Sequence, residues 1–214
     1  MAPIFVPLSA ISLEGEKKMP DLYILFEKSN SAIGKIGRLV MPYPYTHVTI
    51  SFDGETYHSF SRRKLHDPFD AGFTDEKLAY FAYEEVEVRI YTLKITDDEK
   101  AKIEAFMDQV KDCPFDVMDM ILMPLIHGHR RENAYNCMSF VAEVLEILSF
   151  SLPNRRYKNS IEDIENTLIK YGAEGKTVTL PKQFDEEYMK NVGLKDKLSS
   201  FFRLFYRLYG KRGI

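Results

Sequence analysis

The chain has 214 residues, of which 45% are hydrophobic and 29% charged, as is ordinary for a globular protein that can bury a core. Its net charge is −3 and no basic patch with a binding motif lies outside the C-terminal segment, so nucleic acid is not an expected partner. Cys113 and Cys137 lack the spacing of a disulfide framework, which favours a reducing compartment, and no segment is apolar over the length of a membrane span. The expected location is therefore cytoplasmic.

The first half of the chain predicts a strand at residues 21–26 and a hairpin at residues 45–60. Asp-Gly between two runs of β-branched and aromatic residues is typical of a two-residue hairpin turn. Paired positions then sum to 107, which places His47 and His58 on one face of the hairpin, with Cα atoms about 7–8 Å apart. A three-residue turn would instead put the two histidines on opposite faces, so the prediction depends on the register.

After the hairpin, residues 61–67 are interpreted as a solvated basic loop. Apolar and charged residues alternate over residues 86–93, which predicts a half-exposed strand. Thr96 and Glu99 form a capping box that predicts a helix from there to about residue 112.

A second helix is predicted to begin just before Cys137, because Asn136 is a good N-cap residue. Cys137 then lies in the first turn, on the apolar face that continues through residues 140–148. The helix N-terminus favours a thiolate and offers N–H donors to an oxyanion. Taken alone, however, a cysteine on an apolar face is equally typical of core packing.

The stretch between these helices is Met-rich at residues 115–126, where a short helix beneath the Cys137 helix is expected. His127 and His129 follow it, but they lack a second Cys/His pair at ligand spacing. No metal is therefore expected, and these histidines are assigned to a loop.

Beyond residue 150 the sequence predicts a helix at residues 161–172 capped by Ser160, a short strand at residues 177–180 and an amphipathic helix at residues 194–209. Residues 195–214 contain six basic residues and one acidic residue, a net charge of +5, so that the rest of the chain carries −8. A basic helix rich in Phe, Leu and Tyr can lie in a membrane interface. The alternatives are that it docks on the domain or forms a dimer interface.

These motifs together resemble the circularly permuted papain-like hydrolases, which include the YiiX-like branch of the NlpC-type peptidases and the lecithin–retinol acyltransferase-like thiol enzymes. The resemblance rests on His47 in a Tyr-Thr-His-Val-Thr-Ile strand, on His58 11 positions later, and on Cys137 in an Asn-Cys-x-x-Phe-Val helix start 79 positions further on. The run at residues 22–34 is similar to the first strand of the family and the segment after it, so the resemblance covers roughly residues 20–150.

The resemblance implies an α+β, permuted papain-like fold in which an antiparallel sheet packs on the nucleophile-bearing helix. Cys137 would be the nucleophile, His47 the general base and His58 the residue that orients the base, with no cofactor. Tyr45 and Asn136, which flank the site, are expected to contact a peptide or acyl-amide substrate. A His in the third position is similar to the acyltransferase-like members, whereas the YiiX-like members more often have an acidic residue there.

The expected organisation is a catalytic domain at residues 1–150 and a helical extension at residues 151–214 that packs on it or is tethered to it. The expected function is that of a cysteine hydrolase, an amidase or peptidase that works through a thioester. Two alternatives remain open at this point: a thiol acyltransferase or phospholipase in peripheral contact with a membrane through residues 194–214, and a binding module in which Cys137 is inert.

Overall fold

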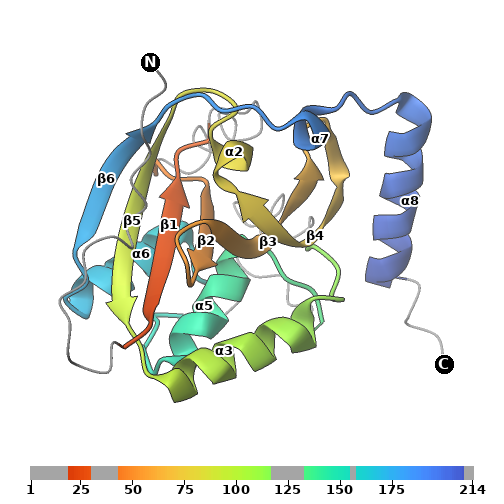
Figure 1. The fold of residues 1–214 in the computed structure, drawn as a ribbon. Coiled ribbons are helices and arrows are strands. Elements are labelled where there is room, and N and C mark those ends of the chain that lie inside the picture. Colours follow the sequence, from red (N-terminus) through yellow and green to blue (C-terminus); the bar gives the residue numbers. More distant parts are fainter. Residues whose placement is uncertain (1–18, 30–42, 117–132, 155–157, 210–214) are drawn as a thin grey trace.

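The protein folds into one six-stranded antiparallel sheet with helices, an α+β architecture (Figure 1). The structure is a computed structural model that describes residues 19–29, 43–116, 133–154 and 158–209. The strand order is β4-β3-β2-β1-β5-β6. The strands are β1 (Asp21–Glu27), β2 (His47–Ser51), β3 (Thr56–Lys64), β4 (Asp67–Lys77), β5 (Val86–Lys94) and β6 (Gly175–Leu180).

Capping boxes begin three of the helices, at the N-cap residues that the sequence predicts. Thr96 and Glu99 form the box that begins α3, and Asn136 with Ser139 forms the one that begins α5. Ser160, predicted as a cap, does the same for α6. The helices are α2 (Leu78–Phe81), α3 (Asp97–Val110), α5 (Cys137–Ile147), α6 (Ile161–Lys170), α7 (Glu186–Met189) and α8 (Leu194–Tyr209).

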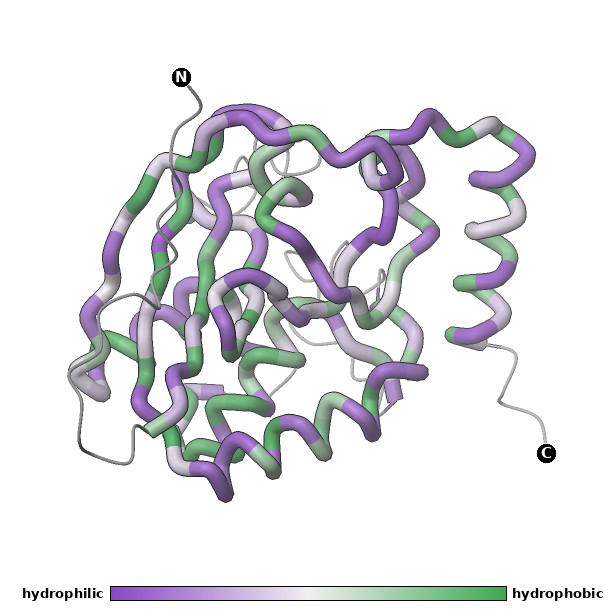
Figure 2. Tube along the Cα trace, viewed as in Figure 1, coloured by the Kyte–Doolittle hydropathy of each residue, from purple (hydrophilic) through white to green (hydrophobic). Residues whose placement is uncertain are grey.

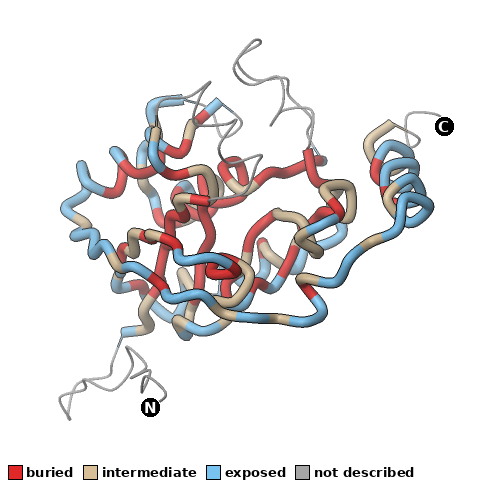
Figure 3. The backbone as a smooth tube through the Cα atoms, turned by 90° about the horizontal axis from the view of Figure 1, so that it is seen from above, coloured by how far each residue is buried: buried red, intermediate tan, exposed pale blue. Residues whose placement is uncertain are grey.

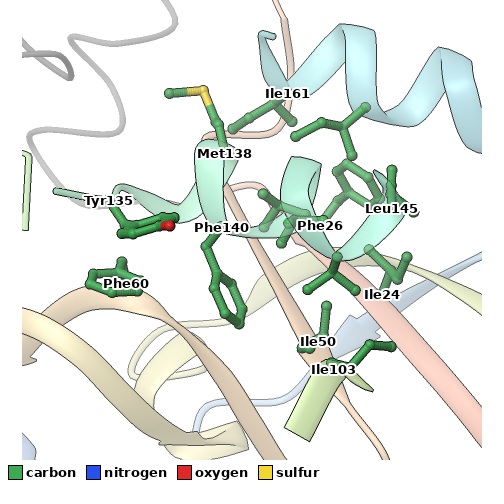
Figure 4. Close-up of a cluster of buried hydrophobic side chains, with 14 of the residues drawn as sticks. Ile24, Phe26, Ile50, Phe60, Ile103, Tyr135, Met138, Phe140, Leu145 and Ile161 are labelled. Atoms are coloured by element: carbon green, nitrogen blue, oxygen red, sulfur yellow. The ribbon is translucent and has the colours of Figure 1, made fainter. Parts of the chain in front are cut away.

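The main core lies between one face of the sheet and the helices α3, α5 and α6. Phe140 at its centre is fully buried and stacks on the ring of Phe106, while Tyr135 stacks on Phe60 of β3 (Figure 4). Along the tube of Figure 2, hydrophobic and hydrophilic residues alternate on β5, as expected for a strand whose two faces have different surroundings. A smaller cluster on the other face includes Tyr57, Phe81 and Val88.

The hairpin of β2 and β3 forms as predicted, but the predicted register was wrong. Ile50 pairs with His58, so paired positions sum to 108 and not to 107. Since alternate residues of a strand point to opposite faces, His58 shares the face of Ile50, and His47 lies on the other face. The shift of one residue separates the two histidines.

The turn itself explains the shift, because it is longer than two residues. Asp53 Oδ1 accepts hydrogen bonds from the N–H groups of Glu55 and Thr56, both at 2.8 Å. Ser51 Oγ accepts a third from Gly54 at 2.9 Å, and Gly54 has φ +75°, which glycine adopts without strain. Side-chain bonds of this kind stabilise a wider loop than the minimal Asp-Gly turn.

The basic run at residues 61–67 is not a loop, contrary to the prediction. Its first part continues β3 to Lys64, and Asp67 begins the 11-residue strand β4. The sequence of β4 contains Pro68 and Gly72, which are depleted from strands and hide its alternation.

The segment beyond residue 150 contributes to the same sheet, because β6 pairs along β5. On α6, the buried carboxylate of Glu165 accepts hydrogen bonds from Arg89 at 3.1 Å and from the Tyr91 hydroxyl at 2.7 Å, which ties this helix to β5. His127, His129 and almost all of the Met-rich stretch lie outside the described residues.

Helix α8 has the predicted bounds and packs beside β4 at the edge of the molecule (Figure 1). Leu204 is buried in this contact, and the ring of Phe201 stands edge-on to Phe69 of β4 with 5.1 Å between centroids. Arg207 Nη2 donates to the carbonyl of Asp112 at 2.6 Å. Of the helices described, α8 included, none combines the length and apolar character needed to cross a bilayer.

Candidate active site

Cys137 is the first residue of α5, as predicted. The Asn136 side chain accepts a hydrogen bond from Ser139 N at 2.8 Å, and the Ser139 side chain bonds back to Asn136 N at 3.0 Å. This reciprocal cap fixes the first turn of the helix, where the N–H groups have no intrahelical acceptor. Cys137 is half-buried, and it and Cys113 are both reduced thiols. A half-buried thiol at a capped N-terminus can still be reached from solvent.

His47, the first residue of β2, is held by a carboxylate from β4. Its Nε2 lies 3.1 Å from Oε1 and 3.0 Å from Oε2 of Glu76. The Glu76 side chain is only 4% exposed and that of His47 14%, so the pair is largely shielded from water. Shielding strengthens the attraction between an imidazolium and a carboxylate.

Cys137 belongs to the same cluster as His47. Burial lowers the pKa of His47, but the charge of Glu76 and hydrogen bonds with Cys137 and Glu76 raise it further, so that it lies well above its usual range. The surroundings of His47 therefore favour the protonated form of its imidazole. An imidazolium next to a cysteine at a helix N-terminus is the environment that activates catalytic thiols.

Glu27 of β1 is a second buried acid at this site. It is the cross-strand partner of His47 and is 5% exposed. Burial raises its pKa to about 7, with the neighbouring His47 lowering it and Glu76 raising it. Arg62, whose Nε donates to the Tyr188 hydroxyl at 3.1 Å, also lowers the pKa of Glu27. The cluster thus places two carboxyl groups around one imidazole.

His58 is not part of this cluster, so its assignment as the residue that orients His47 was wrong. Its Nδ1 lies 2.8 Å from Oδ1 of Asp75, whose side chain is 67% exposed, and its ring stacks on Phe73. The structure brings Cys137 and His47 together, and the carboxylate that contacts His47 is that of Glu76.

The two residues predicted to contact substrate have structural surroundings. Tyr45 is buried, and the Arg89 guanidinium lies 5.4 Å above its ring centre. Asn136 is buried too and provides the helix cap. Contact of either residue with a substrate stays a prediction.

Glu76 and Glu27 were missed by the sequence reasoning. Glu76 stands in the run Asp75-Glu76-Lys77, and three successive charged residues are typical of an exposed loop. Alternation of Phe69, Ala71 and Phe73 is the only signal of a strand there. Glu27 is the last residue of an apolar strand, a position where a charged side chain is expected to be exposed to solvent.

Comparisons with family models, with curated proteins and with solved structures find no match for this chain. Among the described residues, no group of three or more His, Cys, Asp or Glu side chains could hold a metal ion. The site is therefore interpreted from its own geometry, which combines a thiol at a helix N-terminus, an imidazole and a buried carboxylate.

Proposed function

We propose that the protein is a cysteine hydrolase of permuted papain-like fold that cleaves an amide bond through a thioester, with Cys137, His47 and Glu76 as its triad. The observation that carries the proposal is the position of His47 between the buried carboxylate of Glu76 and the Cys137 side chain. A nucleophile, a base and a group that orients the base are the parts that such catalysis requires. The acidic third residue is the pattern of the YiiX-like members of the family the sequence resembles.

The ring nitrogens of His47 have separate roles in this mechanism. Both oxygens of Glu76 approach Nε2, so Nδ1 is the nitrogen that exchanges a proton with the thiol. Nδ1 takes the proton of Cys137, which forms the thiolate–imidazolium pair, and the thiolate sulfur then attacks the carbonyl carbon of the amide. The carbonyl π electrons move to oxygen, and the oxyanion accepts hydrogen bonds from N–H groups in the first turn of α5.

The intermediate then collapses and the C–N bond breaks. The leaving nitrogen takes the proton from His47 Nδ1 and departs as an amine, which leaves the acyl group on sulfur as a thioester. Water attacks the thioester while His47 accepts a proton from it, and the thiolate leaves. The products are a carboxylic acid and an amine, and Glu76 keeps the imidazolium aligned in both halves of the cycle.

A lipid-directed acyltransferase or phospholipase is the second candidate, with the same triad. The observation that favours it is the set of large apolar side chains that α8 leaves exposed. In that case the acceptor of the acyl group would be an alcohol or amine at a membrane and not water.

The first test is the pH dependence of iodoacetamide labelling at Cys137, read by mass spectrometry in wild type and in His47→Ala. An activated Cys137 should react well below pH 8.5, about where an ordinary thiol ionises. Removing His47 should slow the reaction at pH 6 by about 100-fold or more, the range expected when a positioned base is lost. Cys113 provides the reference thiol in the same chain, and its labelling should not change.

Acyl transfer is tested with p-nitrophenyl acetate as an activated acyl donor. Wild type should accumulate one acetyl group at Cys137 that hydroxylamine removes, and Cys137→Ala should not. If Cys137 labels no faster than Cys113 and acquires no acetyl group, the proposal fails and the chain is a binding module with an inert thiol.

A further inference from the structure

Helix α8 exposes a strip of large apolar side chains that the fold leaves uncovered. Figure 3 shows this helix at the edge of the molecule, exposed over most of its length, with its buried positions on one side only. The strip is formed by Leu194 (76% exposed), Leu198 (50%), Phe201 (39%), Phe202 (65%), Phe205 (51%) and Tyr206 (68%). Contiguous exposed apolar patches mark protein–protein or membrane contacts.

The strip has the shape of an interfacial helix. At 3.6 residues per turn its members fall within an arc of about 140°. Ser200 and Leu204, both buried, lie on another side of the helix and face the domain. Phe201 is the member of the strip nearest the domain, and one side of its ring packs on Phe69 of β4. This contact and that of Arg207 with Asp112 hold the helix with the rest of the strip turned outward. The helix is thus already formed before it meets a partner.

The charges on α8 distinguish between two partners that could cover the strip, a second copy of the chain and a membrane. Lys195, Lys197, Arg203 and Arg207 are basic, and Asp196 is the only acidic residue of the helix. Lys197 and Arg203 flank the strip on its two sides, and Lys195 lies within its arc. A symmetric dimer through this face would bring two basic helices together. An anionic bilayer would attract the helix and repel residues 1–194, which carry a net charge of −8.

We infer that α8 docks the protein on an anionic membrane surface, with its apolar strip in the headgroup region and the side chains of Lys195 and Lys197 at the lipid phosphates. The body of the domain, attached through Leu204, then stays on the aqueous side. This binding goes beyond the proposed hydrolase activity and does not depend on Cys137.

The test is co-sedimentation of the full chain with vesicles of phosphatidylcholine alone and with about one third phosphatidylserine. Wild type should bind the anionic vesicles and should not bind the neutral ones. Binding should weaken as salt is added. Phe202→Ser with Tyr206→Ser should reduce the affinity by about tenfold or more, because two exposed rings no longer enter the interface. Both side chains point away from the domain, so circular dichroism should be unchanged.

A matched pair of charge variants separates local from overall charge. Lys195→Gln on α8 should weaken binding by about fivefold, whereas Lys176→Gln on β6, at the opposite edge of the sheet, should not change it. Cys137→Ala should bind as wild type does, which separates this inference from the enzyme proposal. The inference is overturned if anionic vesicles are not bound or if the double variant binds them as well as wild type does. It is also overturned if light scattering shows that wild type is a dimer and the double variant a monomer.

Discussion

Two neighbouring residues of β4 each hold a histidine, on opposite faces of the same sheet, and their surroundings differ. Glu76 pairs with His47 beside Cys137, and Asp75 pairs with His58 on the other face. The contact distances are similar, at 3.0 and 2.8 Å. The Glu76 side chain is 4% exposed, whereas that of Asp75 is 67% exposed.

The comparison teaches that the surroundings of a His–carboxylate pair, and not its distance, decide what it can do. Water screens the ion pair at His58, so this pair contributes little to stability. At His47 the carboxylate is shielded and the pKa of the imidazole rises well above its usual range. Exposed histidine–carboxylate contacts are therefore poor evidence for a site, and buried ones next to a thiol are good evidence.

The largest effect should come from exchanging one carboxylate for an amide on each face. Glu76→Gln keeps the shape of the side chain but removes the charge that raises the pKa of His47. Cys137 labelling at pH 6 should slow by about 10- to 100-fold, because the lower pKa of His47 leaves less of Cys137 as the thiolate. The rate of iodoacetamide labelling measures this.

Asp75→Asn is the matched control, because it removes the same charge from the adjacent residue. Its labelling rate should stay within about fivefold of wild type, as an exposed pair is worth at most about 1 kcal/mol. Equal losses in the two variants would mean that the general field of β4, and not contact with His47, controls Cys137.

A smaller effect concerns the buried acid beside His47. Because the pKa of Glu27 is raised from 4.5 to about 7, the folded chain keeps this proton where an unfolded chain has lost it. The free energy of unfolding should therefore decrease as pH rises from 4.5 to about 7. Glu27→Gln cannot ionise at this position. Its free energy of unfolding relative to that of wild type should therefore increase by up to about 3 kcal/mol over this pH interval.

Urea unfolding of both proteins at several pH values measures that gain. An offset between them that does not vary with pH would show that Glu27 ionises normally. The effect on Cys137 labelling should be secondary, since Glu27 is a neighbour of the triad and not part of it.

The smallest effect is expected from His58→Gln. The ring is half-buried against Phe73 and bonds to an exposed carboxylate, so unfolding free energy should fall by no more than about 1 kcal/mol. Cys137 labelling should follow the wild-type pH profile. A loss comparable with that of Glu76→Gln would restore His58 to the site and refute the register of the hairpin.

The sequence determined the local elements, because their signals are local. The capping residues Thr96, Asn136 and Ser160 begin helices where predicted, since a side chain that satisfies nearby N–H groups acts within one turn. The alternation in residues 86–93 identified β5, and the amphipathic run identified α8 with its bounds. Cys137 at a helix start and His47 at a strand start follow from the same local rules.

Tertiary structure decided which residues meet at the site. The register of β2 and β3 depends on side-chain bonds of Ser51 and Asp53 in the turn, and a shift of one residue moved His58 to the other face. Glu76 reaches His47 only because β4 forms and pairs along β3, a contact between residues 29 positions apart that no local pattern encodes. Burial then gives that contact its strength, and burial belongs to the whole fold.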